Sequence, residues 1–202
     1  MGQTSDAKDR LIEATAALMH ARGFNAVGVQ EICASAGVQK GSFYHFFKSK
    51  DDLAAAALDK HWSDARNQFW RLAFGEDIAP LDRIRRFFQM AYFYFKQAHD
   101  AGTGIWGCPF GNAALEMAAH NDAISEKVSL VFSDATSFFR RAIEDAARRG
   151  DISTQDPQQS AESLWAYYEG ILVVAKARRD PEVIRRLGNE AIKFLRPTRN
   201  LS

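Results

Sequence analysis

The most constraining feature of this sequence is the run 29–47, which has the pattern of two short helices joined by a tight turn. Ile32 and Ala36 are four residues apart, so they give the first helix an apolar side. The matching apolar side chains of the turn and the second helix are Val38, Phe43 and Phe46. Gly37 lies where the chain must reverse, and glycine enters a left-handed conformation at no steric cost. The run therefore predicts a helix-turn-helix unit.

Polar side chains remain on the outer side of the second helix. They are Gln39, Lys40, Ser42, Tyr44 and His45. Such groups donate and accept hydrogen bonds to DNA phosphates and base edges. The pattern predicts a unit that reads DNA, and the alternative is a helix pair that serves only for packing.

The same run, extended to Leu53, resembles the DNA-binding signature of the TetR/AcrR family of bacterial transcriptional regulators. The residues that carry the resemblance are Ile32, Ala36, Gly37, Val38, Gly41, Ser42, Phe43, Tyr44, His45, Phe46, Phe47 and the segment 50–53. The similar region runs from about Asp6 to Leu53. Two residues depart from the family pattern, Cys33 in place of alanine and Gly28 at a helix N-cap that favours Thr or Ser. A buried cysteine behaves as a small apolar residue, so we expect the helix contact to survive.

The resemblance implies that the second helix enters the major groove of double-stranded DNA. It places Gln39, Ser42, Tyr44 and His45 against the DNA, and Lys48 and Lys50 against phosphates. It also implies that Gly41 allows a close approach of the backbone and that Gln30 begins the helix crossing the phosphate backbone. One such unit makes few contacts, and the family solves this by forming a homodimer on a near-palindromic operator.

Apolar residues recur at intervals of three and four along the whole chain, and no segment has a strand pattern. We therefore predict an all-α protein with an N-terminal three-helix helix-turn-helix domain (1–53) and a C-terminal helical ligand-binding and dimerisation bundle (54–202). The helices are predicted at about 6–22, 29–36, 40–46, 49–72, 81–98, 109–119, 122–149, 158–178 and 181–195.

Charge and cysteine content exclude several classes of protein. The net charge is +1, and residues 1–50 carry +2, so DNA affinity should depend on a few placed contacts and on dimerisation. The two cysteines offer neither a disulfide framework nor metal spacing, and we predict no metal and no cofactor. No apolar stretch approaches the length of a membrane span, and the polar start is not a signal peptide. We expect a reduced, cytoplasmic protein without a membrane partner.

Half of the 24 aromatic residues fall between Trp62 and Phe110. Aromatic walls with a few polar groups suit a small-molecule cavity, and the family holds its inducer in this region. The alternative is a packed aromatic core. The predicted ligand-binding residues are Trp62, Phe88, Tyr92, Cys108, Phe110, Asn112, Glu116 and Tyr168.

Cys108, Asn112 and Glu116 share one face of a short helix because they are spaced four residues apart. If that face turns inward, they are polar contacts for a ligand. If it turns outward, Glu116 is a solvated acid, or Asn112 and Glu116 bond to neighbouring backbone. Cys108 also lies at a helix start, which can lower a thiol pKa, so a thiol switch is a second hypothesis.

The last two predicted helices each carry an apolar stripe, and stripes from two subunits would form a four-helix interface. The predicted interface residues are Leu164, Trp165, Ile171, Leu172, Ile184, Leu187 and Phe194. The alternative is that these side chains only cover the core of their own chain.

Together these features predict a ligand-responsive transcriptional regulator, a repressor released from its operator by a small hydrophobic or aromatic inducer. The alternatives are release by thiol modification of Cys108 and a regulator without any inducer. The sequence has no Gly-rich phosphate loop, metal-ligand spacing or nucleophile elbow, so we do not expect an enzyme.

Overall fold

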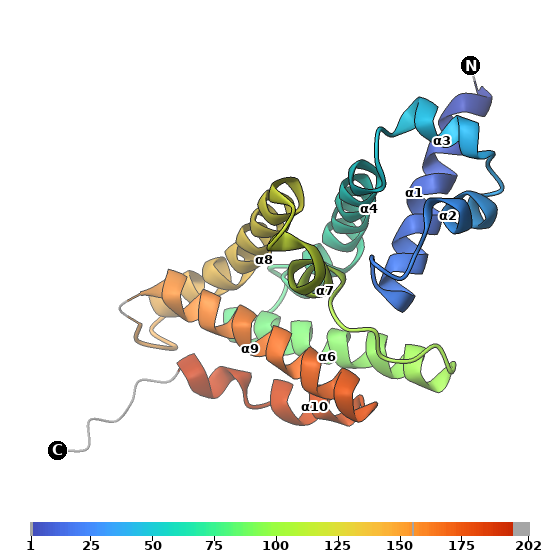
Figure 1. Cartoon of the computed structure of the whole chain (residues 1–202). Helices are drawn as coiled ribbons and strands as arrows, with labels where there is room; N and C mark the ends of the chain where they lie inside the picture. The colour runs from blue at the N-terminus through green and yellow to red at the C-terminus, as the bar shows by residue number, and fades with distance from the viewer. Residues whose placement is uncertain (1, 155, 196–202) are drawn as a thin grey trace. The chain divides into compact units, whose positions relative to one another are not determined.

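The computed structural model describes residues 2–154 and 156–195, and within these ranges it contains helices and loops but no strand (Figure 1). This confirms the predicted all-α fold class. The chain divides into two compact units, which we describe separately. Unit 1 consists of Met1–Ala65 and Cys108–Val131, and unit 2 of Arg66–Gly107 and Phe132–Ser202. The predicted domain division at residue 53 stays a prediction.

Unit 1 contains the helix-turn-helix and a segment from the middle of the chain. Its elements are α1 (Gly2–Arg22), α2 (Val29–Ala36), α3 (Lys40–Phe46), α4 (Lys50–Ala65), α7 (Pro109–Ala113), the π-helical turn η2 (Ala114–Ala118) and the first part of α8 (Asp122–Arg148). Helix α1 packs against α2, α3, α4 and α7. Ser49 caps α4 as its sequence position suggests, because the Asp52 N–H donates to its Oγ at 3.0 Å.

The helix-turn-helix forms around an apolar core of its own. Its buried side chains are Leu11, Val27, Ile32, Cys33, Ala36, Phe43, Phe47 and Leu53. The predicted α2 and α3 are confirmed, and so is the turn, where Gly37 has a φ of +62° and closes α2. Cys33 is buried as a small apolar residue, and burial raises the pKa of its thiol. The unit thus fixes α3 from its apolar side.

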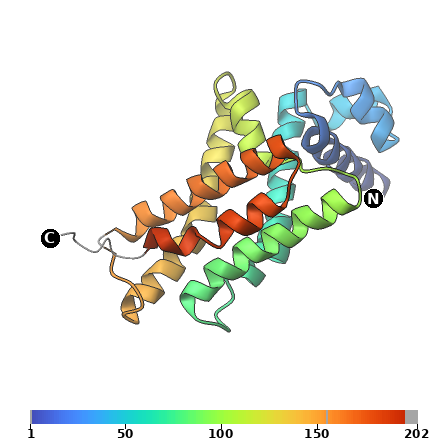
Figure 2. The ribbon, with the colours of Figure 1, turned by 90° about the horizontal axis from the view of Figure 1, so that it is seen from below.

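Unit 2 holds the aromatic part of the chain. Its elements are η1 (Arg66–Trp70, a π-helical turn), α5 (Arg71–Ala73), α6 (Pro80–Asp100), the second part of α8, α9 (Pro157–Arg178), α10 (Glu182–Gly188) and the 3₁₀ turn η3 (Ala191–Leu195). Helix α10 lies beside both α6 and α9 (Figures 1 and 2). Pro80 and Pro157 begin α6 and α9 in the first turn, where a missing N–H costs nothing.

Aromatic rings fill the centre of unit 2. The Phe87 ring lies 4.8 Å from Trp70, 4.9 Å from Phe139 and 4.9 Å from Tyr168, as measured between centroids. Offset and edge-on arrangements at such distances are the favourable ones for aromatic pairs. The aromatic residues of this unit therefore form a packed core, which was one of the two interpretations of their clustering in the sequence.

Three predicted helices are interrupted. The predicted helix 49–72 contains the π-helical turn η1, and the predicted helix 109–119 contains the π-helical turn η2. The predicted helix 181–195 ends at Gly188 and resumes as η3. A Cβ on Gly188 would lie 2.9 Å from the Cβ of Phe88, so only glycine allows this approach of α10 to α6. Among the described residues, no helix has the length and apolar character needed to cross a membrane.

Candidate nucleic-acid interface

Helix α3 is held by its apolar side and leaves its polar side open. Phe43 is fully buried, whereas the neighbouring Tyr44 is 58% exposed. Eight of the nine predicted DNA-binding residues are exposed, namely Gln30, Gln39, Lys40, Gly41, Ser42, Tyr44, His45 and Lys48. A rigid helix that presents amide, hydroxyl, imidazole and ammonium groups can contact both phosphates and base edges.

Gly41 lies on this open surface. A Cβ built at Gly41 meets no atom within 4 Å, so nothing in the chain itself requires glycine there. Glycine in a helix costs stability relative to alanine. The close approach of the backbone to DNA at this position stays a prediction.

Lys50 differs from the other eight predicted residues because its ammonium group already has partners. Its Nζ donates to the carbonyl oxygens of Phe24 and Val27, both at 3.0 Å, and lies 3.9 Å from the centroid of the Phe24 ring. These contacts fix the loop between α1 and α2 to the first residue of α4. The ammonium group that we predicted to contact a phosphate is thus already bonded within the chain.

The same loop is held a second time, by Glu116. The Phe24 N–H donates to Glu116 Oε2 at 2.9 Å, and the Asn25 N–H donates to the same oxygen at 3.3 Å. Gly23, which ends α1 with a φ of +84°, makes room for the carboxylate, because a Cβ there would lie 2.5 Å from Oε1. Of the alternatives for Glu116, bonding to backbone is the one that the structure shows.

Two polar pairs continue the attachment of the segment 108–131 to α4. The Asn121 Nδ2 donates to Asp51 Oδ2 at 2.8 Å, and Lys127 Nζ lies 2.7 Å from Asp59 Oδ1. Both pairs are at least partly exposed, so each contributes little free energy alone. Together with the Glu116 contact they fix the position of this segment along α4 and beside the loop between α1 and α2.

A small cavity lies beside the Glu116 contact. Its volume is about 30 Å³, and its lining includes His20, His61, Asn112 and Glu116. This is room for roughly one water molecule. Burial of His61, and secondarily the neighbouring His20, lowers the pKa of His61 from its ordinary value of 6.5 to about 4. The imidazole is thus neutral at physiological pH.

Comparison with known proteins agrees with this arrangement. The family model described as "Bacterial regulatory proteins, tetR family" matches residues 11–57, and the model "Tetracyclin repressor-like, C-terminal domain" matches residues 80–190. The chain belongs to the TetR family of transcriptional regulators. Members of this family are DNA-binding regulators and not enzymes.

Several TetR-family relatives are similar over most of the chain. Transcriptional regulator AcuR of Cereibacter sphaeroides is 30% identical over 87% of this chain and 79% of its own length. The transcriptional repressor NemR of Escherichia coli K12 is 26% identical over 88% of this chain and 87% of its own. The crystal structure of a regulatory protein TetR from Rhodobacter sphaeroides is 28% identical, covers 93% of this chain and 98% of its own, and superposes with a TM-score of 0.82.

The predicted ligand-binding residues of this TetR-family chain divide between the two units. Trp62, Cys108, Phe110, Asn112 and Glu116 belong to unit 1, and Phe88, Tyr92 and Tyr168 belong to unit 2. In unit 1 the rings of Trp62 and Phe110 pack edge-on at 5.8 Å. In unit 2 the rings of Phe88 and Tyr168 pack at 6.0 Å, whereas the Tyr92 hydroxyl donates to Glu182 Oε1 at 2.6 Å. These residues stay candidates for ligand contact.

Most of the predicted dimer residues lie inside unit 2. Leu164, Trp165, Ile171, Leu172 and Ile184 are buried within the single chain, Leu187 is half-buried and Phe194 is exposed. A side chain that is buried in its own protomer has little surface left for a partner. The burial of these five side chains is the pattern expected if the stripes cover the core of their own chain, and the predicted interface residues stay a prediction.

Two long-range contacts in unit 1 could not be predicted from the sequence. Glu116 reaches a loop 92 residues before it, and Lys50 reaches back 26 residues to Phe24. Neither spacing follows a helical period, so only the tertiary structure brings these groups together. The glycine at position 23 was a visible clue to the turn but not to the carboxylate beside it.

We predict that Glu116→Ala lowers the free energy of unfolding by about 1–3 kcal/mol, because two backbone N–H groups lose a charged acceptor. Glu116→Gln keeps one oxygen and should lose less. Urea unfolding followed by circular dichroism measures both variants. Glu126→Ala, an exposed acid on α8, serves as the control and should match the wild type. Equal stability of Glu116→Ala and the control would show that the Glu116 contact does not contribute to the free energy of unfolding.

We also predict a pH dependence due to His61. Since its folded-state pKa is about 4, below the ordinary 6.5, the unfolded chain binds the proton more readily between these values. The free energy of unfolding should therefore fall, by roughly 2 kcal/mol, as pH is lowered through that window. His61→Gln should flatten the dependence and His99→Gln should not. An identical pH profile for wild type and His61→Gln would contradict this.

Proposed function

We propose that this TetR-family protein is a dimeric repressor that binds a near-palindromic operator through α3 and is released by a small hydrophobic or aromatic molecule. The single observation that carries the proposal is the state of α3, whose apolar side is locked by Phe43 while its polar side faces solvent. A fixed helix with exposed hydrogen-bonding groups is what major-groove reading requires. Cytoplasmic location follows from this role.

In the proposed DNA complex, Gln39, Ser42, Tyr44 and His45 contact the major groove, and Lys40 and Lys48 contact phosphates. Gln30 contacts the backbone from α2. Gly41 allows the helix to approach the DNA closely, which explains a glycine with open space around it. Lys50 acts indirectly by holding the loop between α1 and α2.

For release, we propose that the signal reaches the DNA-reading unit through the segment 108–118. This segment holds the turn at Phe24 and Asn25 through Glu116, and it includes the π-helical turn η2. Such turns recur at functional sites because one extra residue shifts the register of a helix. A ligand that moves this segment would change the position of α1, with a coupling free energy of about 1–3 kcal/mol in typical systems.

The burial pattern supports a different dimer surface from the predicted one. Helix α9 exposes Ala166, Gly170, Val173 and Ala177, spaced so that they share one face. Phe194, 58% exposed, packs its ring 4.7 Å from that of Tyr167 at the side of this face. Small residues let two helices approach closely, so we propose that α9 pairs with its counterpart in a second copy.

A thiol switch at Cys108 is the second candidate for release, and one contact favours it. The Gly111 N–H donates to Cys108 Sγ at 3.4 Å at the start of α7, an arrangement that stabilises a thiolate. Cys108 as a whole residue is 8% exposed, so a modifying reagent must be small. Mass spectrometry after mild electrophile treatment separates the two mechanisms. DNA release with Cys108 unmodified would exclude the thiol switch.

Fluorescence anisotropy with the DNA that flanks its own gene tests the proposed function, with shuffled DNA for comparison and a salt series. We predict selective binding that Gly41→Ala and His45→Ala each weaken about tenfold or more. Gly41→Ala should leave stability unchanged or raise it by up to ~1 kcal/mol, so lost binding would report on the interface alone. Ser35→Ala, exposed on α2, is the control. Full affinity of Gly41→Ala would contradict the proposed approach of α3.

The proposed dimer surface gives a separate prediction. Val173→Glu should yield monomers by light scattering at concentrations where the wild type is dimeric, because an unpaired charge at the centre of an interface costs about 3 kcal/mol or more. Phe93→Glu, at an apolar position on α6 that is 66% exposed against 56% for Val173, should stay dimeric. A dimer that tolerates Val173→Glu but not Phe93→Glu would place the interface elsewhere.

A further inference from the structure

Unit 2 contains a surface cavity that none of the predicted ligand-binding residues lines. Its volume is about 240 Å³, and it lies where the end of α5, the start of α6 and the second half of α8 meet. Three arginines contribute to its lining, together with two phenylalanines and one acid. These residues are Arg71, Arg83, Arg141, Phe74, Phe138 and Glu76.

Among the described residues, two of the three guanidinium groups have no carboxylate partner. Arg141 donates from Nε and Nη2 to the carbonyl and the hydroxyl of Ser137, both at 3.2 Å, and forms no ion pair with a described residue. The Arg71 side chain forms neither a hydrogen bond nor an ion pair with any residue in the described ranges. Glu76 supplies a single negative charge, so the lining is left with an excess of positive charge.

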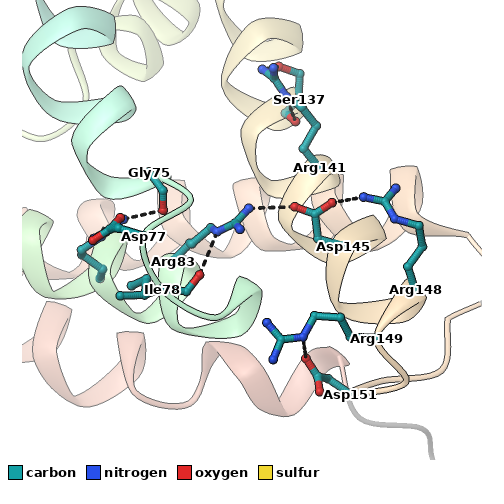
Figure 3. A network of polar contacts seen from close by, with 11 residues as sticks. Gly75, Asp77, Ile78, Arg83, Ser137, Arg141, Asp145, Arg148, Arg149 and Asp151 are labelled. Atoms are coloured by element: carbon teal, nitrogen blue, oxygen red, sulfur yellow. Dashed lines mark hydrogen bonds and ion pairs between the residues drawn. The ribbon is translucent and has the colours of Figure 1, made fainter.

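The third arginine is fixed in place. Arg83, on α6, is 9% exposed and donates from Nη1 to Asp145 Oδ2 of α8 at 2.7 Å and from Nε to the Ile78 carbonyl at 3.3 Å. Figure 3 shows its guanidinium directed at Asp145, with Arg148 on the opposite side of that carboxylate and Arg141 further along α8. Arg83 thus forms a preorganised part of the cavity rather than a mobile side chain.

Aromatic rings form the apolar part of the lining. Phe74 and Phe138 are each 9% exposed, and their rings lie 5.6 Å apart. The guanidinium of Arg141 lies 5.0 Å from the centroid of the Phe138 ring, which holds this cation over the aromatic wall. A ligand in the cavity would therefore meet both aromatic rings and guanidinium donors.

We propose that this cavity binds a small organic carboxylate with an apolar or aromatic body. Guanidinium groups present paired N–H donors that match a carboxylate, and the unneutralised charge of Arg71 and Arg141 favours an anion. The rings of Phe74 and Phe138 favour an apolar body over a bare inorganic anion. The volume lies just below the usual range for drug-sized ligands and suits a compact molecule.

One aromatic residue of the cavity lining also contacts η1, the turn that follows α4 in the chain. Phe74 stacks on Trp70 with an interplanar angle of 7° and a centroid distance of 5.9 Å. Trp70 is the last residue of η1, which directly follows α4 in the chain. A ligand that displaces Phe74 would act on η1, and this regulatory consequence, unlike binding itself, rests on the proposed function.

Isothermal titration calorimetry on the DNA-free protein tests the site with benzoate, benzyl alcohol and inorganic phosphate. We expect saturable benzoate binding that is at least about tenfold tighter than that of benzyl alcohol and of phosphate. Arg71→Gln and Arg141→Gln should each weaken benzoate about tenfold. Arg85→Gln, on the same helix as Arg83 but outside the cavity, should leave it unchanged. Both test arginines are exposed, so their replacement should not impair folding.

Three results would overturn the proposal. Benzoate that binds no better than benzyl alcohol would remove the anion requirement. Phosphate that binds as tightly as benzoate would remove the apolar body from the assigned ligand class. Equal benzoate affinity in Arg71→Gln, Arg141→Gln and Arg85→Gln would place any binding elsewhere. Because the titration contains no DNA, each result is independent of whether the protein reads an operator.

Discussion

The conformation of the loop between α1 and α2 depends on one carboxylate that comes from the middle of the chain. Glu116 accepts hydrogen bonds from the backbone of Phe24 and Asn25, in a turn that Gly23 alone can form with the carboxylate so near. Lys50 holds the same loop through two carbonyl oxygens. Donors and acceptors of this short loop are thus satisfied by a charged group of each sign, which fixes α1 relative to α2 and therefore the base of α3.

The same contact joins the helix-turn-helix to a segment from the middle of the chain. The segment 108–131 folds with the helix-turn-helix into one compact unit, although it is distant in sequence. Glu116 of η2 bonds to the loop that follows α1, and α7, which leads into η2, packs against α1 itself. The arginines and aromatic rings that line the cavity of unit 2 come from other segments of the chain than the helix-turn-helix.

Local physics made the helix-turn-helix predictable and left the rest open. The apolar spacing of Ile32, Ala36 and Phe43 and the glycine at the turn fix α2 and α3 almost to the residue. Periodicity also marks α9, but it cannot tell a stripe that faces the core from one that faces a partner, and Leu164 and Ile171 proved to be buried in their own chain. The role of Glu116 depends on a contact across 92 residues, which no local pattern encodes.

Amide hydrogen exchange at Phe24 and Asn25 tests most directly whether the Glu116 carboxylate fixes the loop between α1 and α2. In the wild type, both amides should exchange slowly although Asn25 is exposed, and in Glu116→Ala both should exchange at least about tenfold faster, while the core amide of Phe43 changes less. Rapid exchange at both sites in the wild type, or equal rates in the two proteins, would contradict the account.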